Sequence, residues 1–167
     1  HMDDAQNVQF LFRDIELADI VRIPTKQRAA VISGRLNGDV VVAGLPDDPA
    51  VYGAIDARGL QMNENDIGDL TLRADVIPDS RRIALSGDLT GQQNDLGIRG
   101  YYSITDRSTP RDLNLIFDVR ALEIASIEDV IPDYITDSEG TVTGEVRITG
   151  SRERPNLLGF LDINAVN

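Results

Sequence analysis

The sequence predicts an all-β protein of antiparallel strands with one or two short helices. Three observations indicate this fold class. Apolar and polar residues alternate along many short runs, and turn-forming residues separate these runs at even intervals. A pattern of glycines also occurs twice along the chain, which is typical of elongated β-repeats. These observations direct the search for function to an extended surface.

The alternation is clearest in the middle of the chain. From Asp69 to Val76 and from Arg82 to Leu89, every second residue is apolar or glycine. Because successive side chains of a strand point to opposite faces, each run has one apolar and one polar face. We expect the polar face to include Thr71, Arg73, Ala84, Arg99, Asn114 and Asp118. The following residues are expected to share one apolar surface: Leu70, Leu72, Val76, Ile83, Leu85, Leu89, Leu96, Ile98, Tyr102, Ile104, Leu113, Leu115, Phe117, Val119, Val142, Val146 and Ile148.

Clusters of Gly, Pro, Asn, Asp and Ser separate these runs. They lie at residues 44–49, 63–66, 78–80, 91–95 and 106–110. Such residues favour turns. Strands that are separated by short turns pair with their sequence neighbours, so the sequence predicts an antiparallel meander.

One segment favours a helix. Ser126 is followed by Ile127, Glu128 and Asp129, so that Ser126 can serve as the N-cap and the carboxylates can occupy the first turn. Pro132 limits the length of this helix. We therefore expect a short helix from Ser126 to Ile131.

The glycine pattern occurs in two copies that are 106 positions apart. Residues 15–20 resemble residues 122–127 at an offset of 107, which suggests that each unit begins with a strand and a short helical segment. We expect residues 3–167 to form one continuous β-repeat segment of a longer protein, with about one and a half units, and His1-Met2 to be a tag remnant. The matching residues are Gly34, Gly38, Gly44, Pro49, Gly53 and Asp56, and then Gly140, Gly144, Gly150, Pro155, Gly159 and Asp162.

Composition excludes several classes of function. The net charge is −12, with 28 acidic and 16 basic residues, which disfavours binding to nucleic acids and to anionic lipid headgroups. The chain has no cysteine, and its one histidine is residue 1. We therefore expect no thiolate or histidine catalysis and no cysteine or histidine metal site.

The carboxylates also form no recognisable catalytic or metal motif. Asp47 and Asp48 lie in an expected turn. The segment from Asn63 resembles the start of a calcium loop, but its twelfth position is Ala74, so EF-hand ligation fails. No nucleotide-binding glycine motif is present. We expect a protein that is not an enzyme and that uses no metal or cofactor.

An apolar sheet surface needs a cover. A second sheet can provide it in a sandwich, and coiling can provide it in a β-helix. In a third arrangement, the sheet curls into an open trough whose lining accepts a ligand. The pattern of residues leaves these three possibilities open.

The segment from Asp137 to Val166 resembles the repeat of the TamB family, the translocation and assembly module proteins, which belong with the AsmA-like proteins. The shared pattern is Gly-x-x-x-Gly, a short apolar strand that ends in glycine, a polar spacer that ends in proline, and then a glycine within a further strand. The preceding residues 124–134 resemble the helical link of that repeat. In register, the resemblance extends from about Ile15 to the end of the chain, whereas residues 69–119 match only in style.

The resemblance implies a β-taco, which is a curled antiparallel sheet that forms a U-shaped trough with an apolar interior. It implies a periplasmic part of an inner-membrane-anchored protein in a Gram-negative bacterium, with a TamA-like Omp85 barrel as partner. The implied function is transport of phospholipids to the outer membrane or assistance in outer-membrane protein assembly. The surface defined above then becomes a groove for acyl chains. The alternative is a structural or adhesive β-repeat with a sealed core.

Overall fold

The chain consists almost entirely of β-strands. The computed structural model describes residues 6–17, 22–24, 29–45, 50–63, 65–78, 82–103, 113–127, 139–151 and 154–166. Its elements are β1 (Gln6–Glu16), β2 (Arg22–Pro24), β3 (Ala29–Leu45), β4 (Ala50–Met62), β5 (Asn65–Ile77), β6 (Arg82–Thr90), β7 (Asp95–Ser103), β8 (Leu113–Glu123), α1 (Ile124–Ile127), β9 (Glu139–Gly150) and β10 (Pro155–Val166). The predicted all-β class is confirmed.

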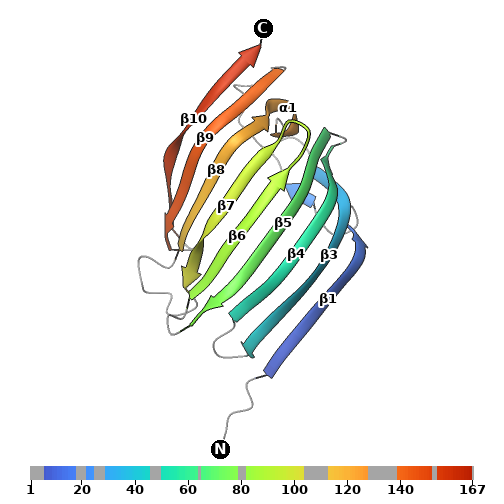
Figure 1. The fold of residues 1–167 in the computed structure, drawn as a ribbon, viewed down its shortest axis with the longest axis vertical. Helices are drawn as coiled ribbons and strands as arrows, with labels where there is room; N and C mark the ends of the chain where they lie inside the picture. The colour runs from blue at the N-terminus through green and yellow to red at the C-terminus, as the bar shows by residue number, and fades with distance from the viewer. Residues whose placement is uncertain are drawn as a thin grey trace, which may run out of the picture.

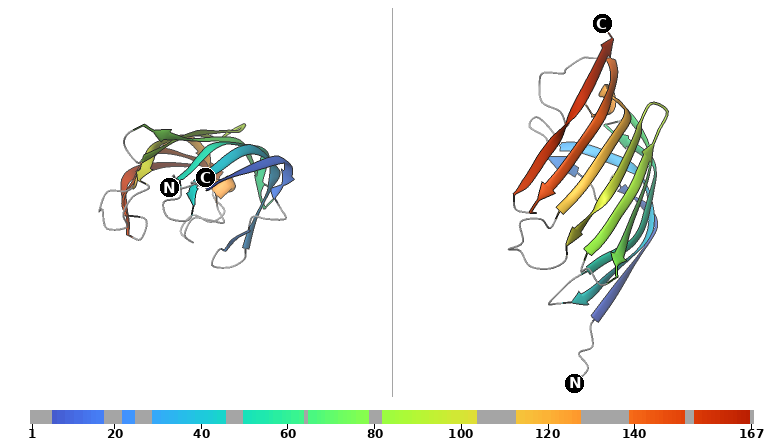
Figure 2. Two further views of the ribbon diagram at one scale, coloured as in Figure 1. Left: turned by 90° about the horizontal axis from the view of Figure 1, so that it is seen from below. Right: turned by 60° about the vertical axis from the view of Figure 1, so that its left-hand side comes forward.

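Nine strands form one open antiparallel sheet in the order β1-β3-β4-β5-β6-β7-β8-β9-β10 (Figure 1). The short strand β2 pairs with the beginning of β3, off this path. Sequence neighbours thus lie side by side, as the meander prediction requires. The sheet is curved and does not close, so β1 and β10 are its two edges (Figure 2).

The pairing register places residues of one kind in rows across the sheet. Three adjacent rows cross all nine strands and contain only apolar residues and glycine; we call their surface the apolar face. The central row is Phe10, Val40, Gly53, Ala74, Leu85, Gly100, Leu115, Ile148 and Leu157. The flanking rows are Phe12, Gly38, Ile55, Leu72, Gly87, Ile98, Phe117, Val146 and Gly159, and Ile15, Leu36, Ala57, Leu70, Leu89, Leu96, Val119, Gly144 and Leu161.

The two copies of the glycine pattern form equivalent hairpins. In β3–β4, Val40 lies opposite Gly53, and in β9–β10, Val146 lies opposite Gly159, so the pairs differ by 106 positions on both strands. The strands before them also correspond. The β1–β3 ladder shifts register between Phe12 and Ile15, and the β8–β9 ladder shifts at the positions 107 residues later. The unit β8-β9-β10 therefore repeats the unit β1-β3-β4.

Glycine is required at the centre of each hairpin. Gly53 and Gly159 have φ angles of 138° and 156°, which L residues rarely adopt. A Cβ atom at Gly53 would lie 2.1 Å from the carbonyl oxygen of Asp39, and one at Gly159 would lie 2.1 Å from that of Glu145. Both contacts are far shorter than van der Waals distance. The glycines thus let the two strands of each hairpin approach closely.

One end of the apolar face carries a cluster of buried residues. Leu17, Ala57, Leu60 and Leu89 form a buried cluster there. The four-residue helix α1 contacts β4 and β5 as well as β8 and β9. Strands β4 and β9 would be about 24 Å apart on a flat sheet, whereas one turn of helix is only about 6 Å long. The sheet therefore curves around α1, which lies on its concave side (Figure 2).

The predicted start of the helix is wrong. The helix begins at Ile124, so Ser126 lies inside it and is not its N-cap. The Ser126 hydroxyl instead donates a hydrogen bond to the carbonyl oxygen of Asp66 at 3.2 Å and is 1% exposed. The Ser126 side chain is therefore held by a residue 60 positions earlier in the sequence, whereas the neighbouring residues had indicated that it caps the helix. Residues 128–131 lie outside the described residues.

Candidate functional site

The register places sixteen of the seventeen residues that were predicted to share a surface on one face of the sheet. The seventeenth, Ile104, lies outside the described residues. Thr71, Arg73 and Arg99 occupy the alternate positions and lie on the opposite face, as predicted. The assignment of these residues to a lipid groove remains a prediction.

The apolar face is only partly covered. Ile83 is 0% and Val142 is 3% exposed, whereas Val76 is 45% exposed. Most of the other predicted members, including Leu72, Ile98 and Phe117, are half-buried. Within the described ranges, the face has no second sheet above it. This pattern differs from a sandwich, in which such rows are packed against an opposing layer.

The apolar face extends beyond the predicted residues onto β1, β3, β4 and β10. The sequence shows the same alternation from Leu36 to Val42, so this signal was available for β3. Strand β10 gave no such signal because apolar residues occupy both of its faces, as at Leu157 and Leu158. Only the register places Leu157 on the apolar face and Leu158 on the other.

Tyr102 spans part of the apolar face at the end farther from α1. Its hydroxyl donates a hydrogen bond to the carbonyl oxygen of Val51 at 3.1 Å. Tyr102 is in β7 and Val51 is in β4, so the side chain crosses β6 and β5. Beneath this crossing, the β4–β5 ladder ends at the pair Gly53 and Ala74. Tyr102 therefore links β7 to β4 near the point where β4 and β5 stop pairing.

A buried polar group holds α1 against the other end of the face. Asn94 is 2% exposed, and its amide nitrogen donates to the carbonyl of Ile67 at 3.0 Å and to the hydroxyl of Ser126 at 3.1 Å. Its amide oxygen accepts a hydrogen bond from the backbone nitrogen of Glu123 at 2.8 Å. Asn94 thus links the β6–β7 turn to β5 and α1. The sequence indicated only a turn there, because this role depends on partners 27 to 32 residues away.

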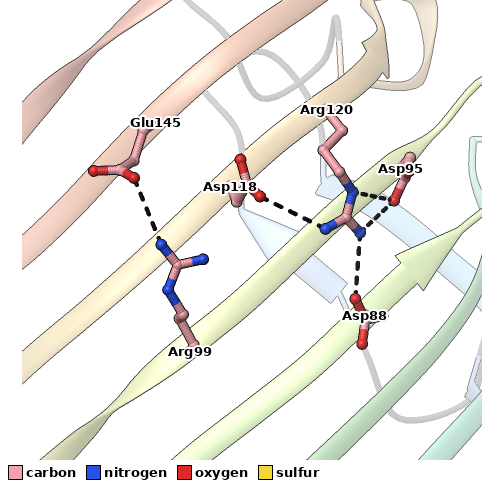
Figure 3. A network of polar contacts seen from close by, with 6 residues as sticks. All are labelled: Asp88, Asp95, Arg99, Asp118, Arg120 and Glu145. Atoms are coloured by element: carbon pink, nitrogen blue, oxygen red, sulfur yellow. Dashed lines mark hydrogen bonds and ion pairs between the residues drawn. The ribbon is translucent and has the colours of Figure 1, made fainter.

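The opposite face carries charged side chains. Arg120 lies between three carboxylates: its Nε donates to Asp95 at 2.8 Å, and its Nη atoms lie 3.3 Å from Asp88 and 3.6 Å from Asp118 (Figure 3). Arg99 pairs with Glu145 at 3.7 Å on the same face. The hydrogen bond from Arg120 lowers the pKa of Asp95, and Asp95 raises that of Arg120. The side chains are 40% exposed or more, so this network is a solvated surface.

The described residues provide no arrangement for metal chemistry. No group of three or more His, Asp or Glu side chains within them could hold a metal ion. Among the same residues, no helix has the length and hydropathy that crossing a membrane requires. The apolar face is therefore the most extensive candidate site of the described structure.

Comparison with known proteins identifies no relative. No family model, no curated protein and no solved structure matches this chain.

Proposed function

We propose that this protein is a periplasmic segment of an envelope-spanning protein of the TamB type, and that its apolar face carries phospholipid acyl chains toward the outer membrane. Assistance in outer-membrane protein assembly is the other activity that the resemblance implies. The observation that carries the proposal is the set of three apolar rows across nine strands, with no second layer of sheet over them in the described ranges.

Acyl chains suit this surface because it is apolar, extended and poor in polar contacts. Each methylene group removed from water contributes about 0.8 kcal/mol. The rows run without interruption by a charged residue from Phe10 in β1 to Leu157 in β10. A chain that lies across them meets similar surroundings at each strand, so it can slide without a deep energy minimum.

In this proposal the curved sheet is a U-shaped trough with the apolar face inside. The headgroups remain in water at the opening, while the charged outer face keeps the protein soluble. The net charge of −12 disfavours docking on anionic headgroups, which is consistent with contact through acyl chains alone. A TamA-like Omp85 barrel is the partner that the resemblance implies, through another part of the longer protein.

A structural or adhesive role is the second candidate. The observation that favours it is the close packing beside α1, where Leu17 and Ile124 are 7% and 0% exposed. If such packing extended along the whole face, the face would be a sealed core. A hydrophobic fluorescent dye separates the two functions, because an accessible face binds it in the folded state and a sealed one does not.

Two neighbouring residues of β5 provide the direct test of lipid contact. Leu72 is half-buried on the apolar face, and Thr71 is exposed on the other face. A photo-crosslinking residue at Leu72 in the longer protein is expected to capture phospholipid in the cell envelope, and one at Thr71 is not. Mass spectrometry of the adducts identifies the lipid. Equal labelling at both positions would contradict the proposal.

A further inference from the structure

The Tyr102 side chain crosses the concave side of the sheet at the end farther from α1. Its hydroxyl hydrogen bond to the carbonyl oxygen of Val51 joins β7 to β4, which are three strand positions apart in the sheet. On a flat sheet, three strand spacings amount to about 14 Å. This distance is far longer than a tyrosine side chain. The sheet is therefore rolled between β4 and β7 at this end, and the hydrogen bond helps to hold the roll.

Tyr102 belongs to a fourth row of residues, which borders the three rows of the apolar face on the same side of the sheet. From β1 to β8 this row contains Val8, Val42, Val51, Val76, Ile83, Tyr102 and Leu113. It is interrupted between β4 and β5, because their ladder ends at Gly53 and Ala74, two residues before Val51 and Val76 would meet. The hydrogen bond from Tyr102 therefore joins the two parts of the row across this interruption.

The burial of this row changes where the tyrosine side chain passes. Ile83 pairs with Tyr102 and lies on β6, between β7 and β4. The Tyr102 ring passes over Ile83 on its way to β4, and Ile83 is 0% exposed. Val51 and Val76, at the interruption, are 39% and 45% exposed. Tyr102 thus covers one aliphatic residue of the predicted acyl-chain surface and leaves the two beyond it accessible.

Different contacts hold the two ends of the rolled sheet. At the α1 end, Asn94 is 2% exposed and makes its hydrogen bonds inside the packing. The hydrogen bond from Tyr102 to Val51 lies at an exposed position. Water can replace a neutral hydrogen bond of this kind, so its loss shifts an equilibrium between two arrangements by only about fivefold. The Tyr102 side chain can therefore leave Val51 while the strands remain paired.

We propose that Tyr102 is a strap over this end of the apolar face, which covers Ile83 when it is bonded to Val51 and is displaced when an acyl chain binds there. The identity of the ligand rests on the proposed function, whereas the covering of Ile83 does not. Methylene groups that contact Ile83, Val76 and Val51 replace the contacts of the ring. Because the strap and the acyl chain compete, a weaker strap gives tighter binding of the acyl chain.

Thiol labelling tests the strap in the absence of lipid, since the chain has no cysteine. Ile83→Cys places a single thiol under the ring, and its alkylation by iodoacetamide is followed in the folded chain. Adding Tyr102→Phe, which removes only the hydroxyl, is expected to accelerate this labelling about fivefold. Leu72→Cys, two rows away on the same face, is the control and is labelled equally fast with either residue at position 102. No acceleration at position 83, or equal acceleration at both positions, would overturn the strap.

A second measurement needs no cysteine and keeps the test decisive if Ile83→Cys fails to fold. The methyl groups of Ile83 beneath an aromatic ring have shifted NMR resonances because of the ring current. In Tyr102→Phe, these resonances are expected to move toward the values of an isoleucine without a neighbouring ring. Unchanged Ile83 methyl resonances would show that the hydroxyl does not hold the ring in place, and the strap would be wrong.

Titration with a fluorescent fatty-acid probe tests the competition. We expect Tyr102→Phe to bind the probe up to about fivefold more tightly than the unaltered chain. Tyr101→Phe is the matched control and binds like the unaltered chain, because Tyr101 lies on the opposite face and the variant keeps the ring on which Arg82 stacks at 4.6 Å. Equal binding by all three chains would overturn the displacement. If no chain binds the probe while labelling at Ile83 responds, the proposed function and the displacement are both wrong, and only the covering of Ile83 stands.

Discussion

Strands β4 and β10 have the same place in two copies of one hairpin, but they have different surroundings. Both pair with the preceding strand in the same register, and both carry a central glycine. Strand β4 is covered by β5, and Ala57 on it is 3% exposed, whereas the equivalent Ile163 on β10 is 43% exposed. The hairpin sequence therefore determines which strands pair, while the next strand determines how far the hairpin is buried.

The largest expected effect is a difference in stability between alanine variants of the two central glycines, Gly53 and Gly159. Gly53→Ala places a Cβ atom 2.1 Å from the carbonyl of Asp39 inside the sheet, so we expect it to lower the free energy of unfolding by about 3 kcal/mol. Gly159→Ala makes the equivalent clash at the edge. Because an edge strand can detach locally, its global cost is expected to stay below about 1 kcal/mol. Urea unfolding measures both values.

Hydrogen exchange of the Gly159→Ala variant shows which strands lose amide protection. In Gly159→Ala, amide protection is expected to fall in β10 while β4 remains protected. Equal losses of global stability in the two variants would contradict the difference between the internal and the edge hairpin.

An intermediate effect is expected at Asn94, which holds the helix that contacts both β4 and β9. Asn94→Ala leaves the buried hydroxyl of Ser126 and the backbone groups of Ile67 and Glu123 without this partner. We expect a loss of about 2 kcal/mol in the free energy of unfolding. Gln93→Ala, at the exposed neighbouring position, is the control and should change stability by less than about 0.5 kcal/mol. Thermal unfolding of both variants measures the difference.

The smallest expected effect on stability concerns an ion pair that β8 has and the equivalent strand β1 lacks. Arg120 in β8 is equivalent to Arg13 in β1, but only Arg120 has a neighbouring β7 that supplies Asp95. Because Arg120 lowers the pKa of Asp95 in the folded state, the ion pair contributes stability above the unfolded pKa of Asp. This contribution is lost as pH falls through the lowered folded pKa.

Because of this ion pair, we expect the contribution of Asp95 to stability to change with pH only in the acidic range. Asp95→Asn is expected to reduce the midpoint of thermal unfolding slightly at pH 7 and to lose less stability than the unaltered chain below about pH 4. Salt should reduce the difference, since the pair is exposed. Identical pH profiles for the two chains would show that the pair contributes nothing to stability.

The sequence predicted the strands, the meander and the two faces, because these follow from alternation along each strand. The faces on which Leu72 and Arg73 lie could be predicted from the alternation alone, without knowledge of distant residues. Contacts between distant residues could not be predicted in the same way. Ser126 was assigned to a cap because its local pattern fits one, but its hydroxyl is buried against Asp66, which is 60 residues earlier.

The candidate site was predicted only in part for a related reason. Alternation identified the face on β5 to β9, but the apolar residues on both faces of β10 concealed which of them belong to it. The bridge from Tyr102 to Val51 depends on where the β4–β5 ladder ends, which is a property of the assembled sheet. The curvature around α1 likewise arises from packing across several strands.

The central claim is that the apolar face accepts acyl chains, and Ile98 tests it most directly. Ile98 lies half-buried in β7, in line with Gly87 and Phe117. On an accessible face, Ile98→Arg can extend its charged group to water, so the chain is expected to fold with little loss of stability. In a sealed core, the buried charge would cost several kcal/mol.

The measurement is titration of the folded chain with a fluorescent fatty-acid probe. We predict that the unaltered chain and the outward control Arg99→Glu bind the probe alike, and that Ile98→Arg remains folded by circular dichroism but binds about tenfold more weakly or not at all. If the unaltered chain does not bind the probe, or if Ile98→Arg unfolds, the apolar face is a sealed core and the account is wrong.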